Sequence, residues 1–152
     1  MQARLNHREL MPELMNSLIA LNKAVDECGL EKSLLHLIKL RASQINGCSF
    51  CVDMHSREAR NDGDTEQRLY LVSAWRESPL FSARERAALD WVESVTRISD
   101  HAPTDQQFAA MRENFADAEI AKLTVAIGMI NIWNRLSVSF QVPHPVTAKA
   151  AE

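Results

Sequence analysis

The 152-residue sequence has few of the features that build β-structure. It contains only 4 Gly, and no run of β-branched residues alternates with polar ones. Strands with one buried face require such alternation, whereas helices show an apolar period of about 3.6 residues. The absence of alternation excludes a mainly β fold, and we expect an all-α protein.

The sequence also lacks blocks of charge and long apolar runs. Lys and Arg number 17 against 20 Asp and Glu, a net charge of −3, and neither sign is clustered. Nucleic acid and anionic membranes are therefore poor partners. The longest nearly apolar run, Leu123 to Trp133, is shorter than the ~18–20 residues of a membrane span, and the N-terminal segment has no apolar signal core. We expect a cytoplasmic protein with no membrane or nucleic-acid partner.

Cysteine is scarce too, but two of the three cysteines form a CxxC pair. An odd count with one such pair indicates a reducing compartment and a redox-active dithiol, here Cys48 and Cys51. Asn46-Gly47 predicts a helix stop, so Cys48 opens a new helix whose dipole favours a thiolate. A Cys48–Cys51 bridge would distort the first turn, because i,i+3 Cβ atoms on a helix lie about 5–6 Å apart and a disulfide needs about 3.5–4.5 Å.

Amphipathic periodicity and capping signals predict a single domain of six to eight helices over residues 1–145, followed by a flexible tail, 146–152. Capping boxes are predicted at Ser82–Glu85 and Thr104–Gln107, and a related cap at Asp64–Gln67. The expected helices begin at Pro12, Glu31, Cys48, Asp64, Ser82, Thr104 and Ile120. The buried stripe of the first of these is expected to comprise Leu14, Leu18, Leu21, Val25 and Cys28.

Three segments carry a resemblance to a known family. They are Leu40-Arg-Ala-Ser-Gln-Ile-Asn-Gly-Cys-Ser-Phe-Cys-Val-Asp-Met-His55, Trp75-Arg-Glu and Asn131-Ile-Trp-Asn-Arg135. The sequence resembles the AhpD-like alkylhydroperoxidases of the carboxymuconolactone decarboxylase superfamily. The resemblance implies an all-helical dimer, trimer or hexamer that reduces peroxides at its cysteine pair. It also implies recharging by an external thiol or dithiol reductant, with no metal or flavin cofactor.

The resemblance also assigns roles to the catalytic residues. Cys51 attacks the peroxide, Cys48 condenses with its sulfenic acid, and His55 handles the proton. From the residues themselves the order of attack stays open, because Cys51 and His55 are i,i+4 neighbours whereas the helix terminus acts more strongly on Cys48. Many family members have a glutamate twelve residues before the first cysteine, and here that position is His36. A second imidazole supplies no negative charge, which predicts a weakened relay and a slower peroxidase.

Other interpretations of these residues remain. The thiols could form half of a structural zinc site with Cys28 and His55, although no second CxxC or His pair is present. The dithiol could sense oxidants without useful turnover, or the chain could be a decarboxylase-like member of the superfamily. Asn131, Asn134 and Arg135 interrupt an apolar helix, where they could line the active cavity or fix a subunit contact.

Overall fold

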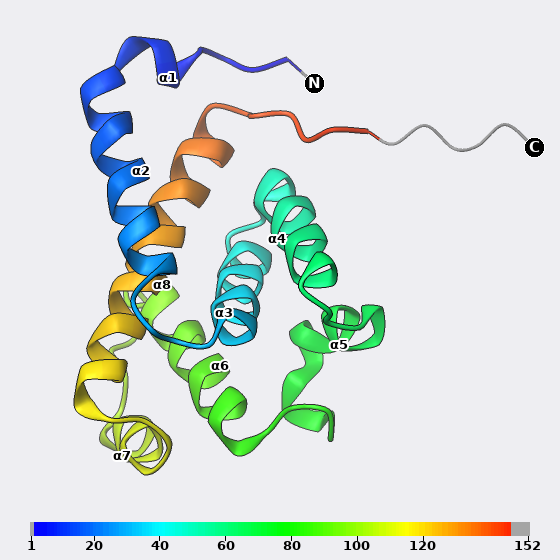
Figure 1. Cartoon of the computed structure of the whole chain (residues 1–152), viewed down its shortest axis with the longest axis vertical. Coiled ribbons are helices and arrows are strands. Elements are labelled where there is room, and N and C mark those ends of the chain that lie inside the picture. Colours follow the sequence, from blue (N-terminus) through cyan, green and yellow to red (C-terminus); the bar gives the residue numbers. More distant parts are fainter. Residues whose placement is uncertain (1, 147–152) are drawn as a thin grey trace, which may run out of the picture.

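The computed structural model describes residues 2–146, and every regular element in that range is helical. This confirms the predicted all-α fold (Figure 1). All of the predicted tail except residue 146 lies outside the described residues. The elements are α1 (His7–Leu10), α2 (Pro12–Asp26), α3 (Lys32–Ile45), α4 (Ser49–Asn61), α5 (Glu66–Leu71), the 3-10 helix η1 (Val72–Glu77), α6 (Ala83–Thr96), α7 (Asp105–Asn114) and α8 (Asp117–Ser139).

Helix α3 lies at the centre of the bundle and packs against α4, α6 and α8 (Figure 1). Apolar side chains cover most of its circumference, as predicted, and such a helix is stable only when other elements surround it. Three polar side chains, His36, Lys39 and Ser43, are buried with them, and the first two are titratable. The central helix thus brings titratable groups into the interior of the protein.

Local capping chemistry fixes several helix starts. The Ser82 hydroxyl accepts from the Glu85 amide at 3.3 Å, and the Glu85 carboxylate accepts from the Ser82 amide at 2.8 Å. Thr104 and Gln107 form the same reciprocal pair. Both predicted capping boxes are therefore confirmed. The third cap differs, because Thr65 rather than Asp64 precedes α5 and accepts from the Arg68 amide.

The predicted buried stripe of α2 is wrong in part: Val25 is buried, Leu18 and Cys28 are half-buried, and the other two members are exposed. Leu14 and Leu21 are 62% and 40% exposed, whereas Val25 and Met15 are buried. Helix α2 lies at the edge of the bundle and packs mainly on α8 (Figure 1), so a single neighbour covers only part of its apolar surface. Apolar period alone does not say which part of a wide stripe a neighbour will cover.

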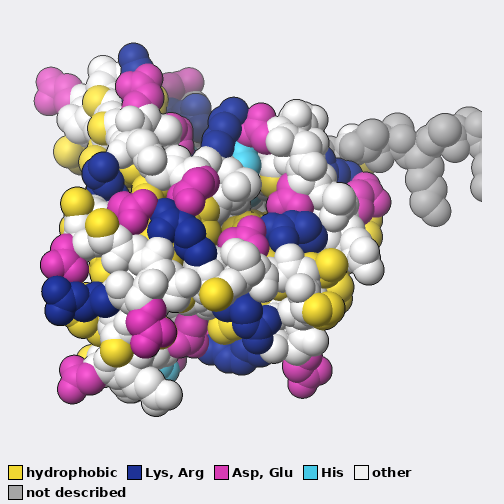
Figure 2. Space-filling model, turned by 60° about the horizontal axis from the view of Figure 1, so that its bottom comes forward, with side chains coloured by type: hydrophobic (Ala, Val, Ile, Leu, Met, Phe, Trp, Pro, Cys, Tyr) yellow, Lys and Arg dark blue, Asp and Glu magenta, His cyan; other side chains and the backbone are white. Residues whose placement is uncertain are grey.

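Helix α8 begins at Asp117, three residues before the predicted start. Three of its apolar side chains are exposed: Val125, Ile132 and Val138. Within residues 2–146, no helix combines the length and the apolar character needed to cross a membrane. Acidic and basic side chains are interspersed over the face shown in Figure 2, in line with the unclustered charge of the sequence.

Candidate active site

The turn between α3 and α4 places the two thiols at the start of α4. Gly47 has φ +64°, a left-handed conformation that glycine adopts without strain, and it ends α3 immediately before Cys48. Cys48 is the N-cap of α4, with extended backbone angles (φ −85°, ψ 93°). The predicted distortion of the first turn is therefore absent, because Cys48 stands just outside the helix rather than in its first turn.

Cys48 and Cys51 are joined as a disulfide, with their Cα atoms 5.4 Å apart. This separation is ordinary for a disulfide. The amide of Cys51 lies 3.3 Å from Cys48 Sγ and donates to it, so the helix terminus acts directly on this sulfur. Both residues are buried, at 2% and 1% exposure, while the free Cys28 is half-buried.

A network of amide side chains ties this turn to α8. The Asn46 side-chain NH₂ donates to the side-chain oxygens (Oδ1) of Asn131 and Asn134, at 3.0 and 2.9 Å. The side-chain NH₂ of Asn134, itself 1% exposed, donates to the Ser43 hydroxyl at 3.0 Å. The Cys48 amide donates to the Ser43 carbonyl. These contacts give Asn131 and Asn134 a structural role within the chain, and neither residue is among those that line the cavity described below.

His55 lies one helical turn after Cys51 and is 5% exposed. Its Nδ1 is 2.8 Å from a carboxylate oxygen of Glu58. The hydrogen bond from the His55 ring lowers the pKa of Glu58 below its ordinary value, which keeps the carboxylate ionised. An ionised carboxylate only accepts, so Nδ1 carries the proton and Nε2 is left as an acceptor when the ring is neutral.

His55 was expected to have no carboxylate partner, because position 36 is a histidine, but Glu58 supplies that carboxylate. The family resemblance places the expected carboxylate at position 36, whereas the i,i+3 spacing of Glu58 from His55 is visible in the sequence. His36 pairs elsewhere: its Nε2 is 2.6 Å from an oxygen of Asp62. That hydrogen bond and the one from Lys32 lower the pKa of Asp62. The protein therefore has two separate imidazole–carboxylate pairs.

A cavity of about 730 Å³ brings both pairs together. Its walls come from α1, α2, α3, α4 and α8 and from residues 27, 62 and 142. Polar lining residues include His36, His55, Glu58 and Asp62, and apolar ones include Leu35, Phe50, Met54, Met129, Ile130 and Trp133. Volumes of this order hold organic ligands rather than only water. No group of three or more His, Cys, Asp or Glu in the described chain could hold a metal, so the zinc alternative has no ligand set there.

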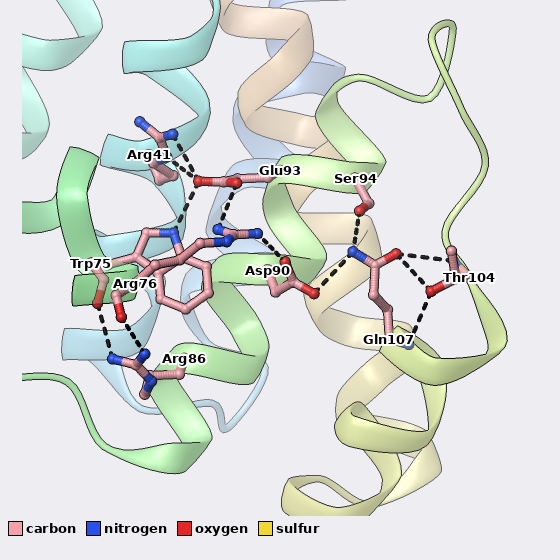
Figure 3. Close-up of polar contacts among 9 residues, drawn as sticks. All are labelled: Arg41, Trp75, Arg76, Arg86, Asp90, Glu93, Ser94, Thr104 and Gln107. Carbon is pink, nitrogen blue, oxygen red and sulfur yellow. Dashed lines mark hydrogen bonds and ion pairs between the residues drawn. The ribbon is translucent and has the colours of Figure 1, made fainter. Parts of the chain in front are cut away.

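A second polar cluster involves the Trp75-Arg-Glu segment and lies around Glu93 of α6 (Figure 3). The Glu93 carboxylate accepts from Arg41 at 2.7 Å, from the Trp75 indole at 2.9 Å and from Arg76 at 2.9 Å. Arg76 also pairs with Asp90. Burial alone would raise the pKa of Glu93, but these donors outweigh it and lower the pKa. The cluster joins α3, η1 and α6 and has a structural character.

Comparison with known proteins gives concordant results. Residues 12–94 match the model of the carboxymuconolactone decarboxylase family. The uncharacterized protein YdfG of Bacillus subtilis is 37% identical over 139 residues, which is 91% of this chain and 95% of YdfG.

Two solved structures are also similar. One is a protein of unknown function from Agrobacterium tumefaciens, with a proposed assignment as the antioxidant defence protein AhpD. It superposes with TM-score 0.94 at 50% identity, covering 96% of this chain and 100% of that one. The other is a peroxidase-related protein from Ralstonia eutropha JMP134, described as an alkylhydroperoxidase AhpD core. It shares the fold, with TM-score 0.80 at 21% identity over 91% of this chain and 74% of its own.

Proposed function

The chain belongs to the carboxymuconolactone decarboxylase family and has an AhpD-like fold, and from its site we propose a thiol-dependent peroxidase that reduces alkyl or hydrogen peroxides at Cys51 and Cys48. One arrangement carries the proposal. A dithiol stands at a helix start, and one turn further along an imidazole is fixed by a carboxylate. Helix terminus and imidazole both favour the thiolate that peroxide chemistry needs.

In the reduced state, His55 Nε2 takes the proton of the Cys51 thiol, and Glu58 stabilises the imidazolium through Nδ1–H. The thiolate attacks the terminal oxygen of ROOH, the O–O bond breaks, and Cys51 becomes a sulfenic acid. The departing RO⁻ takes the proton from His55 and leaves as ROH. Cys51 is oxidised by two electrons, and the peroxide is reduced by the same two.

The second step forms the disulfide. Cys48 starts as a thiol: its sulfur attacks the sulfenic sulfur of Cys51 while its proton passes to the departing oxygen, the S–O bond breaks, and water leaves. An external thiol or dithiol then supplies two electrons and two protons and restores both thiols. The Cys48–Cys51 disulfide corresponds to the end of this step, before reduction.

Access to the sulfurs passes through the cavity in this scheme. The cysteines are almost fully buried, but the cavity is lined by Phe50, Met54 and His55, which are their neighbours on α4. Peroxide enters there, and the reductant must approach over the same opening. Because a buried disulfide is hard for a reductant to reach, the burial also favours a second candidate function. This is an oxidant sensor whose dithiol is oxidised by one equivalent of peroxide and is then reduced slowly.

We further propose that the protein works in the cytoplasm as a homo-oligomer. Leu14 of α2 and Val125 of α8 are 62% and 50% exposed, and Ile132 of α8 is 38% exposed. Apolar surface of this kind on two packed helices is suited to burial against another copy of the chain. Light scattering at micromolar concentration tests this, and a monomer alone would contradict it.

Peroxide consumption with dithiothreitol as reductant tests the peroxidase. We expect wild type and Cys28→Ser to turn over many times, and Cys51→Ser to be inactive. Cys48→Ser, treated with peroxide in the absence of dithiothreitol, should consume one equivalent and keep a sulfenic acid on Cys51 that a dimedone adduct reveals by mass. The reverse pattern would exchange the two roles. A single equivalent consumed by wild type with excess reductant would support the sensor instead.

A further inference from the structure

The turn that carries Cys48 is tied to the rest of the bundle by the side chain of Asn46. Asn46 is the C-cap residue of α3 and lies two positions before Cys48. Its side-chain NH₂ has two hydrogens, and both are donated: to Asn131 Oδ1 at 3.0 Å and to Asn134 Oδ1 at 2.9 Å. The two acceptors are on α8, 85 and 88 residues further along the chain. A single amide group thus connects the turn with a helix that is remote in sequence.

The two acceptors are held in place by contacts of their own. Asn131 donates to the Thr96 hydroxyl of α6 at 3.1 Å, and its Oδ1 also accepts from Arg135 at 3.0 Å. Asn134 donates to the Ser43 hydroxyl at 3.0 Å. Neither amide can rotate without losing these bonds, and buried polar networks whose groups are paired are rigid. The turn is therefore attached to a rigid frame.

The backbone hydrogen bonds of the turn are local. The amides of residues 46–48 donate to carbonyls near the end of α3, those of Ala42, Gln44 and Ser43. Bonds of this kind fix the shape of the turn, but they do not fix its position relative to α8. The exposed Gly47 has no side chain that could pack and supply that restraint.

The two sulfurs are consequently positioned in different ways. Cys51 is on α4, which packs against both α3 and α8. Cys48 stands before that helix with extended backbone angles, so its place is set by the turn. In the oxidised protein the S–S bond keeps the two residues together. In the dithiol a loosened turn would let Cys48 move away, and disulfide formation would have to remove that added conformational entropy.

We propose that Asn46 is a positioning residue that sets the redox equilibrium of the Cys48–Cys51 pair. By fixing the turn to α8 it keeps Cys48 close to Cys51 in the dithiol, and so it favours the disulfide over the dithiol. The proposal rests on the dithiol cycle of the proposed function and adds what determines its equilibrium. Asn46 exchanges neither protons nor electrons, and it acts through the position of Cys48.

Equilibration with glutathione measures this property without peroxide. Two electrons and two protons pass from the protein dithiol to oxidised glutathione, which gives the protein disulfide and two molecules of reduced glutathione. The fraction oxidised follows from the mass after free thiols are alkylated, in a Cys28→Ser background so that only the dithiol reacts. For Asn46→Ala we expect the equilibrium constant for disulfide formation to fall about tenfold, the effect of freeing the backbone of about one residue. A tenfold fall raises the reduction potential by about 30 mV.

Thr124→Val is the matched control. The Thr124 hydroxyl accepts from the Trp91 indole at 3.0 Å, so this variant loses one side-chain hydrogen bond between α6 and α8 and leaves the turn intact. If Asn46 contributed to stability alone, both variants would unfold more easily, and both equilibrium constants would stay within about twofold of wild type. We expect that result for Thr124→Val and not for Asn46→Ala.

An unchanged equilibrium constant in folded Asn46→Ala, a shift toward the disulfide, or an equal shift in Thr124→Val would overturn the proposal. If Asn46→Ala does not fold, Asn46→Ser replaces it, because the shorter, uncharged serine has one donor instead of two. Wild type that consumes no peroxide, together with the expected shift in potential, would reject the proposed function alone. Peroxide turnover by wild type without that shift in the variant would reject only this inference.

Discussion

The protein has two polar regions that share helix α3 but differ in how completely their groups are paired. At the cavity, His36 and His55 each pair one nitrogen with a carboxylate and leave the other nitrogen without a partner. Around Glu93, three donors converge on one carboxylate (Figure 3), and among the described residues no buried side-chain nitrogen or oxygen of this cluster lacks a partner. Complete pairing indicates a structural role, and incomplete pairing beside a cavity indicates a site for reactants.

Removing the carboxylate of the structural region should have the largest effect. Glu93→Ala leaves the half-buried Arg41 and the Trp75 indole without their acceptor, and breaking a buried ion pair costs about 3–5 kcal/mol. We expect the free energy of unfolding, measured with urea, to fall by about 4 kcal/mol. Peroxide reduction per folded molecule should stay within about twofold of wild type. The control for the loss of one negative charge is Glu113→Ala, at an exposed position of α7.

A small loss of stability in Glu93→Ala, together with a large loss of rate, would reverse the assignment of the two regions.

The converse behaviour is expected at the cavity. His55→Gln removes the group that takes the thiol proton, and general-base catalysis of this kind contributes about a hundredfold or more to the rate. We expect the second-order rate constant with peroxide to fall about a hundredfold, or about 2.7 kcal/mol in activation free energy, with unfolding changed by less than about 1 kcal/mol. His101→Gln, in an exposed loop, is the matched control.

Equal rates in wild type and His55→Gln at pH 7 would show that the helix terminus alone ionises the thiol.

The network behind the dithiol should show an intermediate effect. Asn134→Ala removes the acceptor of Asn46 and the donor to Ser43 in a site that is 1% exposed. Buried groups left unsatisfied cost about 1–3 kcal/mol, so we expect unfolding to lose about 2 kcal/mol. Because the Cys48 amide bonds to the Ser43 carbonyl in the same turn, its hydrogen exchange should accelerate more than that of α6. Uniform acceleration over all helices would contradict a local role at the dithiol.

Much of the architecture could be predicted from local chemistry. The caps at Ser82 and Thr104, the stop at Gly47 and the buried character of α3 each depend on residues close in sequence, and the structure has all four. The exposure of Leu14 could not be foreseen, because it depends on how much of α2 its neighbour α8 covers.

The candidate site divides in the same way. The positions of Cys48 at the N-cap of α4 and of Cys51 and His55 along it follow from sequence spacing. His36 and Asp62 are 26 residues apart in sequence, and their pairing depends on how α3 packs against α4. No local sequence pattern predicts such a pair. Glu58 is an intermediate case. Its i,i+3 spacing from His55 can be read from the sequence, but the sequence does not show that His55 bonds to Glu58 rather than to a carboxylate from another part of the chain.

Acid titration gives the smallest effect and compares one carboxylate from each region. The pKa values of Glu93 and Glu58 are both lowered by their donors, so each carboxylate contributes stability above its ordinary pKa of about 4.5 and loses it as the pH falls below that value. Glu93 is the less exposed, with a side chain 13% accessible against 46% for Glu58. Solvent therefore screens the Glu58 pair more strongly.

Between pH 5 and pH 3 we expect Glu93→Gln to flatten the fall in unfolding free energy, by at most about 1.4 kcal/mol per pH unit, and Glu58→Gln to flatten it less. Other carboxylates titrate in the same window, so the difference between each variant and wild type is the quantity to measure. A larger flattening in Glu58→Gln would mean that the cavity pair, rather than the Glu93 cluster, holds the protein together in acid. In that case the completeness of hydrogen-bond pairing would not identify the structural region, because the charge of Glu58 would contribute more to stability than the charge of Glu93.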